Sequence, residues 1–485
     1  MKTLRDSIGL VLVSACAMAA VAGPQQGQIV VDPDNPARMV YHDTYITVND
    51  RQILKPCVFA GPGDPEDFFH NDTEDNLDLL TSKGARCTYI TAWLKDFGGG
   101  SPPSDISSWD AKITELQDAG IITVFFLFDD SRPLPSGWEN AVGDMVDTFK
   151  KHKLFIWSVA EEYGEQMSTS QVSEVAEFIA ERDDYDHVIG VHQNSSSSFD
   201  FNSDTNLGMF LMQYNAGTPD NLHAGCVSAW NNLSGKKILN MAEAADHGKQ
   251  DRATMRAWNW ASIMGGASAV QILWMGRATD PSDWNEQGKY DDCAELMDFF
   301  EKTDINTMVP GDDLAAGSTQ WVLANEGVSY IAYTDNLSGE MGLKGMSPGA
   351  HTLTWLDIGS NATRTTTETA QDGENTFSAP SGFDGEVAVW ITGGESSEPP
   401  VVTRPTTSPR RAGVENSDRE TVFALPGARA PTLTTLSGRC LIGRGPLNPR
   451  TWRMATDTFG RKMYVLKIPG SRGRTIVPIT DSARR

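Results

Sequence analysis

Two segments of the sequence place glutamates directly after an apolar run. One is Ile-Trp-Ser-Val-Ala-Glu-Glu-Tyr at 156–163, which contains Glu161 and Glu162, and the other is Leu-Asn-Met-Ala-Glu at 239–243, which ends in Glu243. Hydrolysis of a glycosidic bond needs two carboxyl groups: an acid that protonates the leaving oxygen, and a carboxylate on the opposite side of the anomeric carbon. Groups roughly 5 Å apart retain the anomeric configuration through a covalent intermediate, whereas a wider separation gives inversion. Repulsion between the two groups raises one pKa, so that one keeps its proton while the other is ionised.

Other polar and aromatic residues follow apolar runs in the same way and are candidates for binding a sugar. Sugar rings present C–H faces to aromatic planes, and their hydroxyls pair with carboxylates, amides and imidazoles. The candidates are Trp93, Asp129, Asp130, Trp138, His192 and His247. Each of these residues, and each of the three glutamates, also has a simpler interpretation as a solvated loop residue, a charge at a helix N-terminus or part of the core.

These side chains need a scaffold that brings the ends of several strands together, and the chain from 55 to 274 predicts one. Short, continuously apolar runs alternate with helical stretches, as expected for parallel strands covered on both faces. Eight such units in roughly 250 residues favour an α/β fold of the (β/α)8 TIM-barrel type, whose active site lies at the C-terminal strand ends. No G-x-G-x-x-G follows a strand, so a dinucleotide fold lacks its phosphate loop. The predicted strands are 57–60, 87–93, 121–128, 154–160, 187–192, 208–214, 238–242 and 269–275.

The predicted helices are 105–119, 140–152, 170–182, 251–265 and 291–303, with Ser168 or Ser170 as the N-cap of the third. A hairpin at 39–54, turning at Asn49 and Asp50, is expected to cover the N-terminal end of the barrel. The barrel domain with this hairpin is therefore assigned to 39–310.

The region at 311–394 changes character and predicts a small all-β sandwich. Alternating strands at 320–324, 329–334, 351–356, 362–367 and 386–392 are separated by turn sequences. A Gly/Ser/Glu/Pro/Thr linker at 395–410 follows. The segment from 401 onward has 14 Arg and 2 Lys, so 411–485 is an Arg-rich tail expected to be poorly ordered. Either this tail is cationic and contacts an anionic surface, or it forms no core at all, and we favour the second.

The N-terminus predicts export. Lys2 and Arg5 precede an apolar stretch at 8–20 and a small-x-small site at 20–22, which together are typical of a signal peptide at 1–22. Val-Ser-Ala-Cys at 13–16 also resembles a bacterial lipobox with Cys16 as the lipidated residue, so the protein is expected to be secreted or periplasmic, with an outer-membrane lipoprotein as the alternative.

Four cysteines remain between the signal peptide and the Arg-rich tail. We expect most to be buried thiols, with room for one disulfide.

Composition excludes several classes of function. The net charge of −24 argues against a nucleic-acid binder, since phosphate recognition needs a basic stripe. The apolar N-terminal stretch is too short to span a membrane. The eight histidines are scattered, no HExxH is present and no cysteine has a metal spacing, so we expect neither metal nor other cofactor. The sequence leaves the oligomeric state open.

The segment at 156–163 resembles the strand-four signature of clan A glycoside hydrolases, which typically ends Ala-Asn-Glu-Pro. The resemblance implies that Glu162 is the acid/base, that Glu243 is the nucleophile on strand seven, and that Glu161 replaces an Asn that contacts the sugar. It also implies a site role for Tyr214 and Asn215 at the end of strand six, and a sugar platform at Trp274 on strand eight.

More narrowly, 55–392 resembles bacterial secreted proteins with an apiosidase-like barrel followed by a β-sandwich of the type named for collagen binding. Residues 65–69, 159–163, 240–248 and 331–345 carry this likeness. Glu161 departs from the clan pattern, which leaves open how the sugar 2-hydroxyl is held and whether Glu161 itself is the acid.

The sequence therefore predicts a secreted retaining glycoside hydrolase that acts on a poly- or oligosaccharide. An inverting mechanism is the near alternative, and a non-catalytic surface protein that binds glycan or matrix through the sandwich is the alternative from another class. A protease is excluded because G-x-S-x-G, HExxH and Cys/His spacings are missing. The sugar, the linkage and the endo or exo mode depend on loop shape. Lys95, Arg132 and Arg277 lie just past predicted strand ends, where they could pair with an anionic sugar. The sequence therefore does not exclude an anionic substrate.

Overall fold

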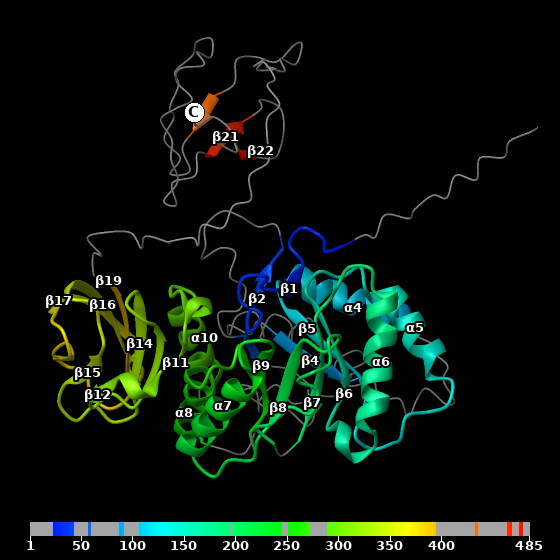
Figure 1. The fold of residues 1–485 in the computed structure, drawn as a ribbon, viewed down its shortest axis with the longest axis horizontal. Helices are drawn as coiled ribbons and strands as arrows, with labels where there is room; N and C mark the ends of the chain where they lie inside the picture. The colour runs from blue at the N-terminus through cyan, green and yellow to red at the C-terminus, as the bar shows by residue number, and fades with distance from the viewer. Residues whose placement is uncertain are drawn as a thin grey trace, which may run out of the picture. The chain divides into compact units, whose positions relative to one another are not determined.

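A parallel β-sheet that curls on itself forms the centre of the protein, as a computed structural model shows (Figure 1). The structure describes residues 23–42, 57–59, 87–91, 106–194, 196–244, 251–271 and 289–393, and three short strands beyond them. Eight parallel strands close the sheet, because β10 pairs with both β9 and β3. The fold is thus a TIM-barrel-like α/β fold. The strands are β3 (Cys57–Phe59), β4 (Cys87–Thr91), β5 (Ile122–Phe128), β6 (Phe155–Ala160), β7 (Ile189–Gln193), β8 (Met209–Gln213), β9 (Ile238–Glu243) and β10 (Ala269–Gln271).

Six described helices lie outside this sheet (Figure 1). A large apolar cluster between helices and sheet contains alternate strand residues such as Phe125 and Trp157, while Val124, Phe126 and Ile156 belong to a second cluster inside the barrel. This alternation explains why the strands are continuously apolar in sequence: both of their faces are buried. The helices are α4 (Ile106–Asp118), α5 (Trp138–Phe149), α6 (Thr169–Arg182), α7 (Pro219–Leu233), α8 (Arg252–Met264) and α10 (Lys289–Phe300).

Helix α6 begins at the predicted N-cap, since the Ser168 hydroxyl accepts a hydrogen bond from the Gln171 N–H at 3.3 Å. Helix α7 is not among the predicted helices. Its signal was available, because Thr218 caps it through the Asn221 N–H and Pro219 occupies the first turn.

A short hairpin covers the N-terminal end of the barrel, but it differs from the predicted one. Strand β2 (Met39–Tyr41) begins where the hairpin at 39–54 was expected, yet it pairs antiparallel with the earlier strand β1 (Ile29–Val31). Ile29 and Met39 join the inner cluster with residues at the starts of the barrel strands, such as Ile122 and Ile238. The segment 43–54, including the expected turn, lies outside the described residues.

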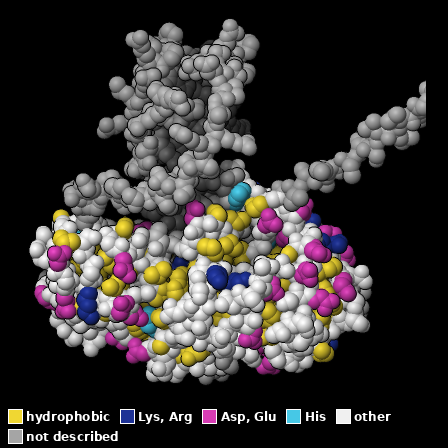
Figure 2. All heavy atoms as spheres, viewed as in Figure 1, with side chains coloured by type: hydrophobic (Ala, Val, Ile, Leu, Met, Phe, Trp, Pro, Cys, Tyr) yellow, Lys and Arg dark blue, Asp and Glu magenta, His cyan; other side chains and the backbone are white. Residues whose placement is uncertain are grey.

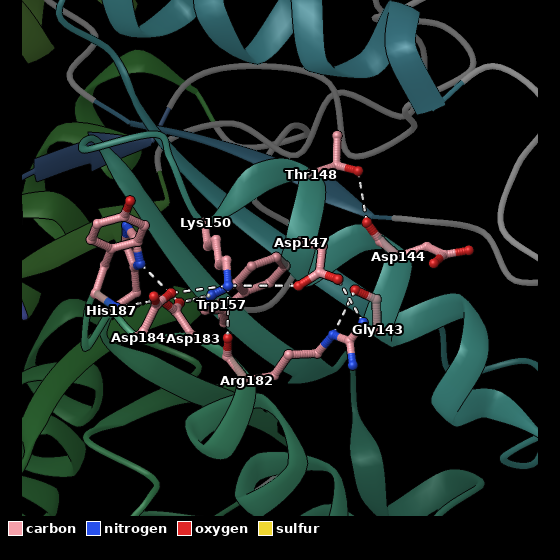
Figure 3. A network of polar contacts seen from close by, with 11 residues as sticks. Gly143, Asp144, Asp147, Thr148, Lys150, Trp157, Arg182, Asp183, Asp184 and His187 are labelled. Atoms are coloured by element: carbon pink, nitrogen blue, oxygen red, sulfur yellow. Dashed lines mark hydrogen bonds and ion pairs between the residues drawn. The ribbon is translucent and has the colours of Figure 1, made fainter. Parts of the chain in front are cut away.

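Strand β6, which leads to Glu161 and Glu162, is anchored from outside by a buried polar network (Figure 3). The Trp157 indole N–H donates to Asp183 Oδ2 at 2.7 Å, and His187 Nδ1 contacts the same oxygen at 2.8 Å. Around it, Lys150 pairs with Asp184 at 2.9 Å, and its ammonium donates to the Arg182 carbonyl. Because buried polar atoms are costly without partners, these contacts fix the register of β6 against α6.

Nine short strands at 309–393 form two antiparallel sheets, which we call the β-domain. One sheet has the order β11-β13-β14-β19-β16-β17 and the other β12-β15-β18. A single apolar cluster contains residues of both sheets, including Tyr330, Trp355, Leu343 and Phe377. The strands are β11 (Val309–Pro310), β12 (Ala315–Gly317), β13 (Trp321–Asn325), β14 (Ser329–Thr334), β15 (Met341–Lys344), β16 (Gly349–Asp357), β17 (Ala362–Ala370), β18 (Glu374–Phe377) and β19 (Val387–Gly393).

The β-domain packs on α7 and α8 of the barrel through stacked rings. His223 of α7 stacks on Trp321 at 4.6 Å between ring centroids, Trp321 on Tyr333 at 4.8 Å, and Tyr333 on Trp260 of α8 at 5.1 Å. The Tyr333 hydroxyl donates to Glu386, whose other oxygen pairs with Arg256 of α8 at 2.6 Å. Barrel and β-domain therefore share one core.

Residues 401–485 form a separate unit, in which the structure describes only β20 (Thr432–Thr434), β21 (Met463–Lys467) and β22 (Thr475–Pro478). These strands pair antiparallel in that order, and the sequence did not predict them. The linker at 395–410 lies outside the described residues, as does the signal peptide.

Cys226 and Cys293 are buried thiols, and Cys87 is disulfide-bonded. Within the described ranges, no helix combines the length and apolar character needed to cross a membrane. Asp and Glu side chains are scattered over the face shown in Figure 2, as the net charge of −24 leads one to expect.

The shared core predicts that damage at the stacked rings destabilises the whole first unit. Trp321 is buried, so Trp321→Ala should lower the free energy of unfolding by about 3–5 kcal/mol because it leaves a cavity between barrel and β-domain. Denaturant unfolding measures this change, and Val328→Ala, at an exposed site on the same hairpin, is the matched control. A loss below about 1 kcal/mol would mean that the two parts are not energetically joined.

Candidate active site

The acidic residues identified in the sequence lie at the C-terminal ends of three barrel strands, the adjacent β5 and β6 and the more distant β9. Glu161 and Glu162 follow β6 directly, Glu243 is the last residue of β9, and Asp129 and Asp130 follow β5. The carboxyl ends of parallel strands open at one end of a barrel, where the TIM fold places its chemistry.

Glu162 is held by contacts on both of its carboxyl oxygens and on its backbone. Its Oε1 accepts a hydrogen bond from Gln213 Nε2 at 2.7 Å, and its Oε2 lies 3.4 Å from Asn194 Nδ2. Its φ of 36° is in the left-handed region, which is strained for a residue with a side chain. The backbone N–H donates to His192 Nδ1 at 3.4 Å. Backbone strain of this kind is typical of functional positions.

Glu243 is placed by an irregularity in the sheet. The β8–β9 register shifts between Met212 and Gln213, so that Gln213 lies opposite Glu243. The Tyr214 N–H donates to the Glu243 carbonyl at 2.7 Å and continues the ladder. The Gln213 side chain also hydrogen-bonds the Glu243 carboxyl group, so one amide contacts both candidate catalytic carboxylates.

Burial and like charge raise the pKa values of three glutamates in this cluster. Burial raises the pKa of Glu161 to about 8, with further contributions from Asp130, Glu243, Glu162 and Asp129. Burial and then Glu243 raise the pKa of Glu162 to about 7, against a lowering by Gln213. The pKa of Glu243 is also raised by burial, and the Gln213 hydrogen bond opposes this.

Within the part of the chain that the structure describes, no ion pair joins these carboxylates to a lysine or arginine. At neutral pH the cluster therefore holds protons that an exposed carboxylate would lose.

His192 lies beside Glu162 as a neutral ring. Its side chain is buried, and burial lowers its pKa to about 3. Because Nδ1 accepts the Glu162 N–H, we assign the ring proton to Nε2, which has no hydrogen-bond partner among the described residues.

Asp129 and Asp130 occupy different surroundings. Asp129 is buried, and its Oδ1 accepts hydrogen bonds from the Ser131 N–H and hydroxyl at 2.9 and 2.8 Å. Asp130 is half-buried, and burial followed by Glu165 and Asp129 raises its pKa. Asp130, Glu162 and Glu165 offer carboxylate oxygens within 4.8 Å of one another, a spacing at which a cation could be bound. Exposed acidic groups often approach one another without an ion, so this spacing alone assigns no metal.

In the structure, two predicted site residues lie away from the acidic cluster. The ring of Tyr214 lies against Gly225 of α7, so closely that a side chain at that position would collide with it. Tyr214 therefore faces outward, and Gln213 takes the inward position. Trp138 begins α5 and is buried against Phe178 of α6 at 5.1 Å, which leaves it no face for a sugar.

Asn215 is exposed just after β8, where a role in binding stays a prediction. Trp93, His247 and Trp274 lie outside the described residues. Sequence reasoning missed Gln213 and Asn194 as site residues, although both stand at the ends of predicted strands, the signal that identified the glutamates.

The sequence matches no protein-family model and no curated protein sequence. The fold, in contrast, is similar to solved structures of glycoside hydrolases. One, described as a glycoside hydrolase, has a TM-score of 0.57 at 12% identity, over 77% of this chain and 98% of the other. A glycoside hydrolase of family 5 from Bacteroides vulgatus has a TM-score of 0.57 at 12% identity, over 76% of this chain and 94% of the other. At this identity the likeness establishes a shared fold.

The raised pKa of Glu161 predicts a pH-dependent stability. A carboxyl group with a raised folded pKa binds its proton more tightly when folded, so the free energy of unfolding falls as pH rises from the unfolded to the folded pKa. For Glu161 this window runs from 4.5 to about 8. Glu161→Gln, which fixes the neutral form, should change little at pH 5 and add on the order of 2 kcal/mol at pH 8.

Denaturant unfolding at both pH values tests this, with the exposed Glu177→Gln on α6 as the control. The low pKa of His192 acts with the opposite sign, but it is common to all three proteins and cancels in the difference. An equal effect of Glu161→Gln at both pH values would show that Glu161 is ionised throughout.

Proposed function

We propose that the protein is a secreted glycoside hydrolase that cleaves a poly- or oligosaccharide with retention of anomeric configuration. The observation that carries the proposal is the single amide of Gln213 in contact with Glu162 after β6 and Glu243 on β9. An amide side chain is short, so two carboxyl groups that share it face one common space. The fold shared with glycoside hydrolases supports the same conclusion.

The two carboxyl groups have different roles in this mechanism. Glu162, with a pKa raised to about 7, keeps a proton near neutral pH and donates it to the glycosidic oxygen as the bond to the anomeric carbon breaks. Glu243 attacks that carbon as a carboxylate and forms a covalent glycosyl ester. Glu162, now ionised, takes a proton from water, and the resulting hydroxide equivalent releases the sugar from Glu243.

Glu161 serves a different purpose in this assignment. Burial, followed by its neighbours Asp130, Glu243, Glu162 and Asp129, raises its pKa to about 8 and keeps it protonated at neutral pH. A neutral carboxylic acid donates one hydrogen bond and accepts others, as an amide does. Glu161 can thus take the place of the Asn that clan A enzymes have before the acid/base, and hold a sugar hydroxyl.

The site also bears on the class of substrate. An anionic sugar at the cleavage point would add charge next to the anionic Glu243 and to Asp130, and no described lysine or arginine forms an ion pair with the acidic residues at the barrel mouth. We therefore propose a neutral sugar there. Arg132 is exposed after β5, and Lys95 and Arg277 lie outside the described residues. Export of the protein rests on its N-terminal sequence and agrees with a disulfide at Cys87.

The assignment predicts separate kinetic signatures for the two glutamates. Glu243→Gln should lower kcat at least ~10³-fold on every substrate, because no nucleophile remains. Glu162→Gln should lower kcat ~10²–10⁴-fold on glycosides with a poor leaving group, and far less on a nitrophenyl glycoside, whose leaving group needs no acid. Rates on a panel of natural and activated glycosides measure this difference.

Glu177→Gln should leave these rates unchanged, and circular dichroism shows whether each variant is folded. If Glu161→Gln, rather than Glu162→Gln, shows the leaving-group dependence, Glu161 is the acid. If the folded wild-type protein cleaves no member of the panel but binds glycan through the β-domain, the enzymatic assignment is wrong.

A further inference from the structure

The amide of Gln213 is the one contact that the two proposed catalytic carboxyl groups have in common among the described residues. We propose that Gln213 is a positioning residue that fixes which oxygen of Glu162 carries the acid proton and keeps Glu243 as the anion. The inference rests on the proposed function, because it assigns a role within that mechanism.

A register shift brings the amide to this place. Met212 of β8 pairs with Met241 of β9, and regular pairing would set Gln213 opposite Ala242. The shift sets it opposite Glu243 instead. Irregularities of this kind often redirect a side chain next to a functional site. The Gln213 side chain is buried, with 6% of its surface exposed, so water does not replace its hydrogen bonds.

The geometry distinguishes the two oxygens of Glu162. Gln213 Nε2 donates to Oε1 at 2.7 Å, and an oxygen that accepts a short hydrogen bond from an N–H is the carbonyl-type oxygen when the group is protonated. The proton then belongs on Oε2. That oxygen has only the 3.4 Å contact to Asn194, too long for a strong hydrogen bond. The Glu165 carboxyl group lies close by, with an oxygen within 4.8 Å of one of Glu162, and it raises the pKa of Glu162.

The register shift sets the same side chain opposite Glu243, and its amide also hydrogen-bonds the Glu243 carboxyl group. An N–H stabilises an ionised carboxylate more than a neutral one, so each hydrogen bond from Gln213 lowers the pKa of its partner. For Glu162, burial, the charge of Glu243 and the contact with Glu165 oppose this lowering of the pKa, whereas for Glu243 burial and Asp130 oppose it. The amide therefore helps to keep Glu243 ionised, while the Glu243 charge and Glu165 keep the proton on Glu162. An amide does not titrate, so it acts in the same way at every pH.

Other titratable groups surround the pair and set the background against which Gln213 acts. Burial, followed by Glu243 and Glu161, raises the pKa of Tyr89 on β4, which stays neutral, and His192 on β7 is neutral as well. The remaining groups are carboxyls: Asp129 and Asp130 after β5, and Glu161 and Glu165 after β6. Within the described residues the neutral donors near the anion, not a cation, must stabilise it.

The experiment compares the pH dependence of kcat/KM in the wild type, Gln213→Met and Gln193→Met. Methionine fills a similar volume but donates no hydrogen bond. Since an N–H that hydrogen-bonds a carboxylate stabilises its ionised form, Gln213→Met should raise the apparent pKa of the acidic limb by about one unit. The maximum of kcat/KM should fall roughly tenfold.

Gln193 is the matched control, because it is a buried amide at the end of the neighbouring strand β7. Its side chain donates to the Ser198 carbonyl at 2.8 Å and accepts from the Asp200 N–H, so it holds a loop rather than the carboxyl groups. Gln193→Met should lower the melting temperature and leave both apparent pKa values in place. If Gln213→Met does not fold, Gln213→Asn withdraws the same amide by one methylene and should shift the acidic limb in the same direction.

A second readout separates this inference from the proposed function. Carbon-13 NMR of the glutamate carboxyl groups, assigned with Glu162→Gln and Glu243→Gln, follows their titration without any substrate. Upward shifts in the Gln213 variants support the inference even if no glycoside is cleaved, in which case only the proposed function fails. Apparent pKa values within 0.2 unit of the wild type, in a folded Gln213 variant, overturn the inference whatever the activity.

Discussion

Repulsion among crowded, partly buried carboxyl groups is the interaction on which the rest of this structure depends. Five acidic residues from β5, β6 and β9 meet at one end of the barrel, and no lysine or arginine within the described residues compensates them. Such a cluster cannot be fully ionised, so some of its carboxyl groups hold protons, and the surroundings of each group determine which ones do. Burial keeps Glu161 neutral, and contacts from Gln213 and Glu165 give Glu162 and Glu243 different pKa values. Burial also keeps the His192 ring neutral. The selective protonation that an acid/base mechanism needs follows from this arrangement.

A cluster of this kind lowers the free energy of unfolding, and packing elsewhere in the structure must offset this loss. The β6 strand is fixed from outside by Asp183, which accepts from Trp157 and contacts His187 in a fully buried network (Figure 3). The β1–β2 hairpin packs on the opposite end of the barrel. The β-domain adds the stack of His223, Trp321, Tyr333 and Trp260 behind α7 and α8. Rigid packing on three sides keeps the strand ends from moving apart under their own repulsion.

The sequence predicted the scaffold better than the direction of its side chains. Both faces of the barrel strands are buried, so apolar runs marked all eight strands and located Glu162 and Glu243 at their ends. The same feature removed the alternation that shows which residues point inward. A register shift that no local pattern reveals turned Gln213 inward and Tyr214 outward. Trp138 was assigned to a loop because the start of α5 was predicted two residues too late. The partner of β2 was missed because strands as short as Ile29–Val31 give little signal.

The proposed mechanism depends most on Glu243 being the group that attacks the sugar. The direct measurement is to trap the covalent intermediate with an activated 2-deoxy-2-fluoro glycoside of the sugar that the protein hydrolyses, and to locate the label by peptide mapping. We expect one label per molecule on the peptide that contains Glu243, carried as an ester. A label on Glu161 or Glu162 would contradict the assignment of roles. An active protein that forms no adduct and releases a sugar of inverted configuration would contradict the retaining mechanism.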